Sequence, residues 1–136
     1  MHAFLRLLPV LLASAGALAQ TQAPAPVQDL PKDLHGRWSA KAAGSPAVTQ
    51  PFDLENIQRK DDNTFAARLT WTGADAKCTI RYQPITGRVT ASGLAFEART
   101  PCNQPLSAEL ARGAGAWVGT ATTQATPPVV VDLTAK

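Results

Sequence analysis

The chain is poor in the residue types on which most catalytic and metal sites depend. Its 136 residues include two cysteines and two histidines, and His35 is the only histidine after the first nineteen positions. A Ser-His-Asp triad would have to use His35, and nothing in the sequence places a nucleophile near it. A metal site usually requires more cysteine or histidine than this. The sequence therefore predicts no catalytic residue, no metal ligand and no cofactor, and we expect a protein that is not an enzyme.

The acidic residues do not change this expectation. Asp53 and Glu55 lie two positions apart on the polar side of an expected strand. Both side chains point the same way, but carboxylates are ordinary on the solvent-exposed face of a strand and do not by themselves indicate acid-base chemistry. The run 61–63 (Asp-Asp-Asn) lacks the later glycine and glutamate of a calcium loop and is typical of a hairpin turn.

Long basic runs are also absent, the longest being the Arg59-Lys60 pair. The chain carries 13 Lys and Arg against 10 Asp and Glu. Removal of Arg6 with a leader would leave 12 against 10, a net charge of +2. Because no basic patch is indicated, we expect no nucleic-acid partner.

The N-terminal residues predict export. Arg6 precedes an uncharged apolar stretch, and Ala17-Leu18-Ala19 gives small residues at both positions that a signal peptidase needs. The stretch is shorter than the roughly 20 apolar residues that span a bilayer, and Pro9 interrupts it. We predict a cleavable signal over 1–19, no membrane span after cleavage, and a periplasmic or secreted product.

The rest of the chain divides into two parts. Residues 20–33 hold three prolines and little that could pack, which predicts a flexible lead-in. Residues 34–136 form the expected domain. In an exported protein the pair Cys78 and Cys102 predicts a disulfide, worth roughly 3 kcal/mol in the chain-entropy model.

From Leu34 onward, apolar residues recur at every second position, which predicts strands with one dry face and one wet face. Short connections favour antiparallel neighbours. We therefore predict an all-β fold, an eight-stranded antiparallel up-and-down meander that closes into a small barrel. Charges on the wet faces argue against an outer-membrane barrel. The expected strands are 36–42, 50–58, 63–72, 76–83, 87–99, 105–112, 115–122 and 127–135.

Segment 87–99 allows two interpretations. Apolar residues occupy odd positions up to Ala91 and even positions from Leu94. Gly93 is either a bulge in one long strand that follows a turn at 84–87, or part of a hairpin turn between two short strands. With a turn at 84–87, only the bulged strand brings Cys102 within the roughly 7 Å that a disulfide allows. We therefore favour the bulged strand.

Trp38, Trp71 and Trp117 lie in similar settings, each within two residues of a glycine. The motif Gly36-x-Trp38 on the first strand of a short-stranded meander resembles the lipocalin and avidin-like barrels, the calycins. In that family the tryptophan of the first strand packs across one end of the barrel and helps to close it. The resemblance implies this role for Trp38.

The inward-facing residues allow either a solid core or a ligand cavity. Core packing alone would account for the tryptophans, and an aromatic wall for a ligand is the alternative. The small inward residues would interdigitate with them or leave space; these are Ala40, Ala67, Ala91, Ala98 and Ala108. The candidate ligand-binding residues are Trp38, Trp71, Tyr82, Phe96 and Trp117.

Two functions remain open at this point. The first, which we favour slightly, is a non-catalytic binding module for a small apolar ligand. The second is a protein-binding inhibitor of an exported hydrolase, of the lipocalin-like protease-inhibitor type. The arrangement of a lead-in followed by residues 33–38 resembles the flexible N-terminal segment and first strand of such inhibitors. The sequence alone does not decide between the two.

Overall fold

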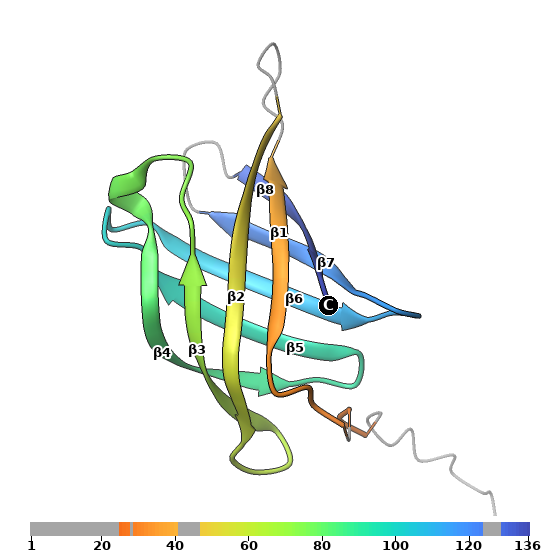
Figure 1. Cartoon of the computed structure of the whole chain (residues 1–136). Coiled ribbons are helices and arrows are strands. Elements are labelled where there is room, and N and C mark those ends of the chain that lie inside the picture. Colours follow the sequence, from red (N-terminus) through yellow and green to blue (C-terminus); the bar gives the residue numbers. More distant parts are fainter. Residues whose placement is uncertain (1–24, 28, 41–46, 124–128) are drawn as a thin grey trace, which may run out of the picture.

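The computed structural model describes residues 25–27, 29–40, 47–123 and 129–136, which form a closed barrel of eight antiparallel strands (Figure 1). Each strand pairs with the next along the chain, and the last pairs with the first. The predicted all-β meander and its closure are confirmed. The strands are β1 (Leu34–Ala40), β2 (Val48–Arg59), β3 (Thr64–Trp71), β4 (Ile80–Val89), β5 (Gly93–Arg99), β6 (Pro105–Arg112), β7 (Trp117–Thr123) and β8 (Val129–Ala135). A short 3₁₀ helix, η1 (Ala76–Cys78), precedes β4.

The predicted signal, residues 1–19, lies outside the described residues. Within the described part of the chain, no helix has the length and apolar character needed to cross a membrane.

Part of the predicted lead-in contacts the barrel where the structure describes it. Val27 and Leu30 are partly buried and pack against the core. The Val27 amide donates to the Thr90 carbonyl at 3.0 Å, and the Arg59 guanidinium donates to the Val27 carbonyl. The described residues 25–27 and 29–33 therefore lie against the barrel, because two apolar side chains among the prolines provide a packing surface.

The barrel interior is built by alternation of buried and exposed residues. Large and small inward residues interdigitate closely: a Cβ atom added to Gly87 would lie 2.5 Å from the Phe65 ring. This packing matches the solid-core alternative in the described part of the barrel. The largest fully buried side chains are Phe52, Phe65, Leu34, Leu54, Leu69, Ile80, Leu94, Leu106, Leu110 and Leu133.

Segment 87–99 is two strands, so the favoured bulged strand was wrong. β4 continues to Val89, and the Thr90 amide donates to the Gly93 carbonyl across a tight turn. Residues 84–87 have the composition of a turn, but they lie inside β4 and pair with β3. Sheet pairing overrides their local preference. Ala91, expected to face inward, is exposed in the turn.

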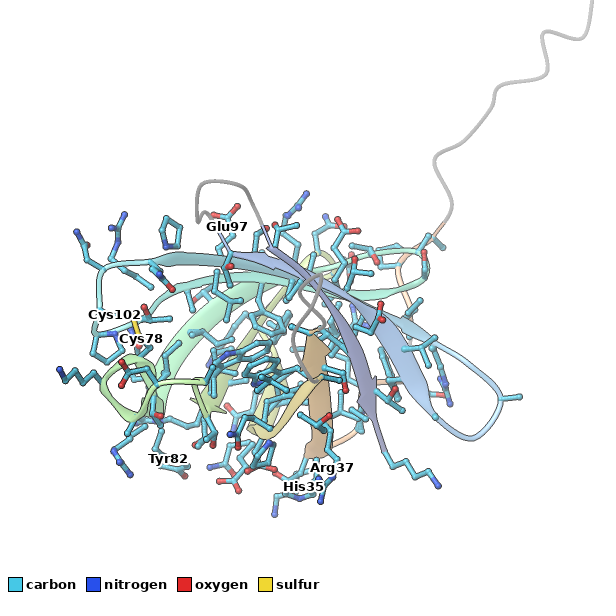
Figure 2. All side chains as sticks on the ribbon, turned by 90° about the horizontal axis from the view of Figure 1, so that it is seen from above. His35, Arg37, Cys78, Tyr82, Glu97 and Cys102 are labelled. Atoms are coloured by element: carbon cyan, nitrogen blue, oxygen red, sulfur yellow. A yellow bond between two sulfur atoms is a disulfide. The ribbon has the colours of Figure 1, made fainter. Side chains whose placement is uncertain are left out.

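The predicted disulfide is present between Cys78 and Cys102, with a Cα–Cα distance of 5.0 Å (Figure 2). The expectation that this bond requires the bulged strand is wrong, because the bond forms with two separate strands. Because β4 runs unbroken through 84–87, the hairpin after Val89 returns β5 toward the start of β4. β4 and β5 pair only where 87–89 meets 94–96, and the disulfide joins η1, which precedes β4, to the turn that follows β5.

Candidate functional site on the outer wall

Two of the predicted ligand residues stack on each other inside the barrel. The rings of Trp38 and Trp71 are nearly parallel, with centroids 5.6 Å apart, and Phe52 tilts against Trp71 at 5.5 Å. Trp38 Nε1 donates to the Thr72 carbonyl at 2.8 Å. Trp38 keeps 5% of its surface exposed and Trp71 keeps 4%. These indoles are covered by other side chains, and the polar atom of Trp38 has a partner.

The structure does not gather the five predicted ligand residues into one site. Phe96 and Trp117 are buried on β5 and at the start of β7. Tyr82 lies on the outer wall with 47% of its surface exposed, although alternation from Ile80 predicted an inward position. Their role in ligand binding stays a prediction.

Two β-bulges flank β3 and explain the position of Tyr82. The β2–β3 register shifts between Glu55 and Gln58, and the β3–β4 register shifts opposite the end of β3. Asn56 and Tyr82 occupy these bulges with φ of 53° and 48°. The left-handed region costs an L-residue about 1–2 kcal/mol, and a bulky tyrosine rarely adopts it. Such strained residues cluster at functional sites.

Side-chain oxygens stabilise both bulges. The Asn56 amide donates to Asp33 Oδ1 at 3.0 Å. The Tyr82 amide donates to Thr70 Oγ1 at 3.2 Å. Each bulge therefore has a specific acceptor from a neighbouring segment, which fixes the direction of the residue that it carries.

The bulges bring three side chains together across β2, β3 and β4. Asn56 Nδ2 donates to Tyr82 Oη at 3.1 Å. Arg68, on β3, places its guanidinium carbon 5.3 Å from the centre of the Tyr82 ring. At an exposed position such a cation–π contact contributes about 0.5–1 kcal/mol. We call Asn56, Arg68 and Tyr82 the outer-wall site.

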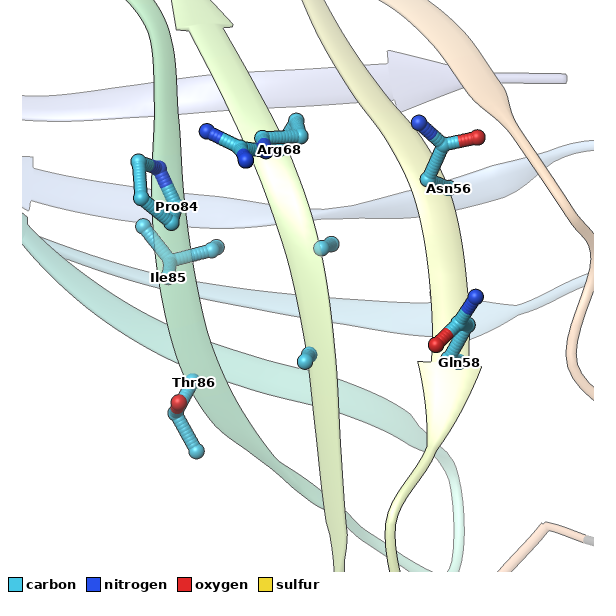
Figure 3. A pocket seen from close by; sticks show the side chains of 8 residues that line it. Asn56, Gln58, Arg68, Pro84, Ile85 and Thr86 are labelled. Carbon is cyan, nitrogen blue, oxygen red and sulfur yellow. The ribbon is translucent and has the colours of Figure 1, made fainter.

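A hollow of about 360 Å³ adjoins the outer-wall site (Figure 3). Gln58 and Arg68 line it from β2 and β3, and Pro84 and Thr86 line it from β4. Between them lies Ala66 of β3, whose small side chain fills little of the hollow. The arrangement offers a guanidinium and two amide groups around one depression, which suits contact with a polar partner surface.

The same wall continues onto β1 with a histidine–carboxylate pair. His35 and Asp53 are direct partners in the β1–β2 register, and His35 Nδ1 lies 2.8 Å from Asp53 Oδ1. This hydrogen bond raises the pKa of His35 above its ordinary 6.5; partial desolvation opposes it, while the charges of Asp53, Asp33 and Glu55 add to it.

Sequence reasoning missed the outer-wall site, although the sequence carries its signal. Buried positions on β2 change from even to odd between Leu54 and Ile57. On β4 they change from Ile80 to Ile85. Each break in alternation marks a bulge, and the residue inside each break is Asn56 or Tyr82.

No family model, curated protein or solved structure matches this chain. The closed antiparallel barrel agrees in architecture with the resemblance to the calycins. Membership of that family stays a prediction.

Proposed function

We propose that this protein is an exported, non-catalytic binding module that recognises another exported protein through the outer-wall site. The observation that supports this proposal is the exposed Tyr82 in a strained bulge, hydrogen-bonded by Asn56 and covered by Arg68. Tyrosine and arginine are the residues that most often dominate binding energy at protein interfaces. A strained residue that leaves 47% of its surface exposed buries little to offset its strain, so its placement is better explained by recognition.

The packed interior favours the protein partner over the small apolar ligand. Trp38 and Trp71 stack on each other, and Phe52 packs against Trp71. A ligand among them would have to replace these contacts. Among exported proteins, a hydrolase is the partner class that the resemblance to lipocalin-like inhibitors implies.

Export is supported by the signal pattern of residues 1–19 and by the disulfide between Cys78 and Cys102. Disulfides form and persist in oxidising compartments. We propose a periplasmic or secreted location with no membrane span after cleavage, and no nucleic-acid partner.

The test is native mass spectrometry of the protein purified from the exported fraction of its own host. We expect a stoichiometric protein partner, and we expect Tyr82→Ala and Arg68→Ala each to weaken it by roughly thirtyfold, the size of an interface hot spot. Val118→Ala is the matched control, because Val118 is also an exposed residue of the wall but lies on β7.

Three results would argue against this proposal. A co-purifying small molecule without a protein partner would favour the ligand function. Equal loss in Val118→Ala would move the interface to the β7 side. Full retention of the partner by both Tyr82→Ala and Arg68→Ala would remove the outer-wall site from recognition.

A further inference from the structure

A second group of side chains lies on β1 and β2, beside the outer-wall site. His35 and Asp53 face each other across the β1–β2 ladder, and Glu55 lies two residues further along β2. One ligand atom of each residue lies within 4.8 Å of the other two. Figure 2 shows His35 on the outside of the barrel. Three potential donors therefore converge from two paired strands, and we call them the His35 cluster.

The donor set matches a divalent transition metal. Zinc is bound by imidazole nitrogen and carboxylate oxygen at about 2.0–2.2 Å, so neighbouring ligands in a tetrahedron lie about 3.4 Å apart. The donors of the His35 cluster lie within 4.8 Å of one another, and His35, whose side chain is 62% exposed, has room to move into ligand geometry. A fourth position would remain for water or for a side chain of a partner.

Glu55 is available for this role. Its direct partner on β3 is Arg68, and opposite charges at such positions ordinarily attract each other. Arg68 instead lies over the Tyr82 ring, and no ion pair between Arg68 and Glu55 occurs among the described residues. Asp33 adds a further carboxylate close enough to act on His35 electrostatically.

We propose that the His35 cluster binds one divalent transition-metal ion of the zinc type. This proposal is independent of the proposed function, because it needs no protein partner. Imidazole favours Zn²⁺, Cu²⁺ and Ni²⁺, whereas Ca²⁺ and Mg²⁺ require more oxygen ligands than the cluster offers. Selectivity for transition metals therefore distinguishes this site from a general patch of negative charge.

The test is titration of the exported, tag-free protein with ZnCl₂, followed by calorimetry and by NMR of the imidazole. After loss of residues 1–19, His35 is the only histidine, so its imidazole signals belong to one residue. We expect binding of one equivalent of Zn²⁺, movement of these signals, and no displacement by excess Ca²⁺. His35→Ala and Glu55→Gln should each weaken binding by at least about tenfold.

The matched control is Glu109→Gln, an exposed carboxylate on the β6 wall that has no histidine among the residues paired with it. It should bind Zn²⁺ as the unchanged protein does. Melting temperatures measured without metal establish that every variant is folded. Equal affinity in His35→Ala, displacement by Ca²⁺, or the absence of saturable binding would overturn the proposal.

Discussion

The two halves of the barrel have one core but different walls. The strands β5 to β8 pair with one another in unbroken register, and buried and exposed residues alternate along β6 and β7. The strands β2 to β4 carry two register shifts, two residues with positive φ and the histidine–carboxylate pair with β1. Among the described strands, β5 to β8 pair without a bulge, so the register shifts and the positive-φ strand residues are confined to the irregular half.

The β4–β5 ladder, which we call the seam between the two halves, is short. β4 and β5 pair over three residues each, 87–89 with 94–96, and the Cys78–Cys102 disulfide joins them beyond this ladder. The core crosses the seam, because Phe65 of β3 packs against Gly87 of β4, which pairs with Phe96 of β5. The halves are therefore two walls of one cooperative unit.

The largest expected effect breaks the core that both halves share. Trp38→Ala removes the stack on Trp71 and the hydrogen bond to the Thr72 carbonyl, and should lower the free energy of unfolding by about 3–5 kcal/mol. Trp117→Ala, in the regular half, should cost a similar amount. Chemical denaturation followed by circular dichroism measures both. Two separate transitions, or a cost below 1 kcal/mol for Trp38→Ala, would contradict the single shared core.

Cutting the link across the seam comes next. Cys78→Ala combined with Cys102→Ala should lower the free energy of unfolding by about 3 kcal/mol, because the unfolded chain regains the freedom of a closed loop. The β4–β5 side should then show the fastest amide hydrogen exchange. Thiol counting on the unreduced protein should find no free cysteine, and two free thiols would contradict the bond.

The fold was predictable from the sequence because alternation is a local signal. The pattern gives strand, face and approximate bounds at β1, β3 and β6 without knowledge of a partner strand. It failed at 84–87, where a sequence typical of turns lies within β4 and is held there by pairing with β3. Local preference alone did not contain that information.

The candidate site was less predictable because it depends on register. That Asp53 lies opposite His35 follows from β1–β2 pairing, and the sequence alone left Asp53 and Glu55 as a solvated face. That Asn56 reaches Tyr82 depends on two bulges, each of which reverses the faces of a strand. Tyr82 was named as a candidate, but its outward direction required the second bulge.

A smaller effect compares backbone strain in the two walls through glycine and alanine variants. At Asn56, where φ is positive, the glycine variant should be more stable than the alanine variant by about 1 kcal/mol. At Ser107, an exposed residue in regular β6, the order should reverse, and glycine should be less stable than alanine by about 0.5–1 kcal/mol. Denaturant midpoints of the four variants measure this. If the alanine variant were the more stable one at Asn56 as well as at Ser107, the bulge would store no strain.

The smallest effect concerns the hairpins of the two walls and depends on pH. Asp61 Oδ1 accepts the amides of Asn63 and Thr64 at 2.8 Å, and the hydrogen bond from Asn63, above all, lowers the pKa of Asp61 below its ordinary 3.8. A carboxyl whose pKa is lowered by folding contributes stability above its unfolded pKa and loses that contribution as the pH falls through the folded value. The melting temperature of the unchanged protein should therefore exceed that of Asp61→Ala by a constant margin down to about pH 4, and the margin should narrow below it.

The corresponding β6–β7 turn, residues 113–116, contains no acidic side chain, so Ala114→Ser should leave a margin that does not depend on pH. An undiminished margin for Asp61→Ala at pH 2 would show that the carboxylate charge does not hold the hairpin of the irregular wall.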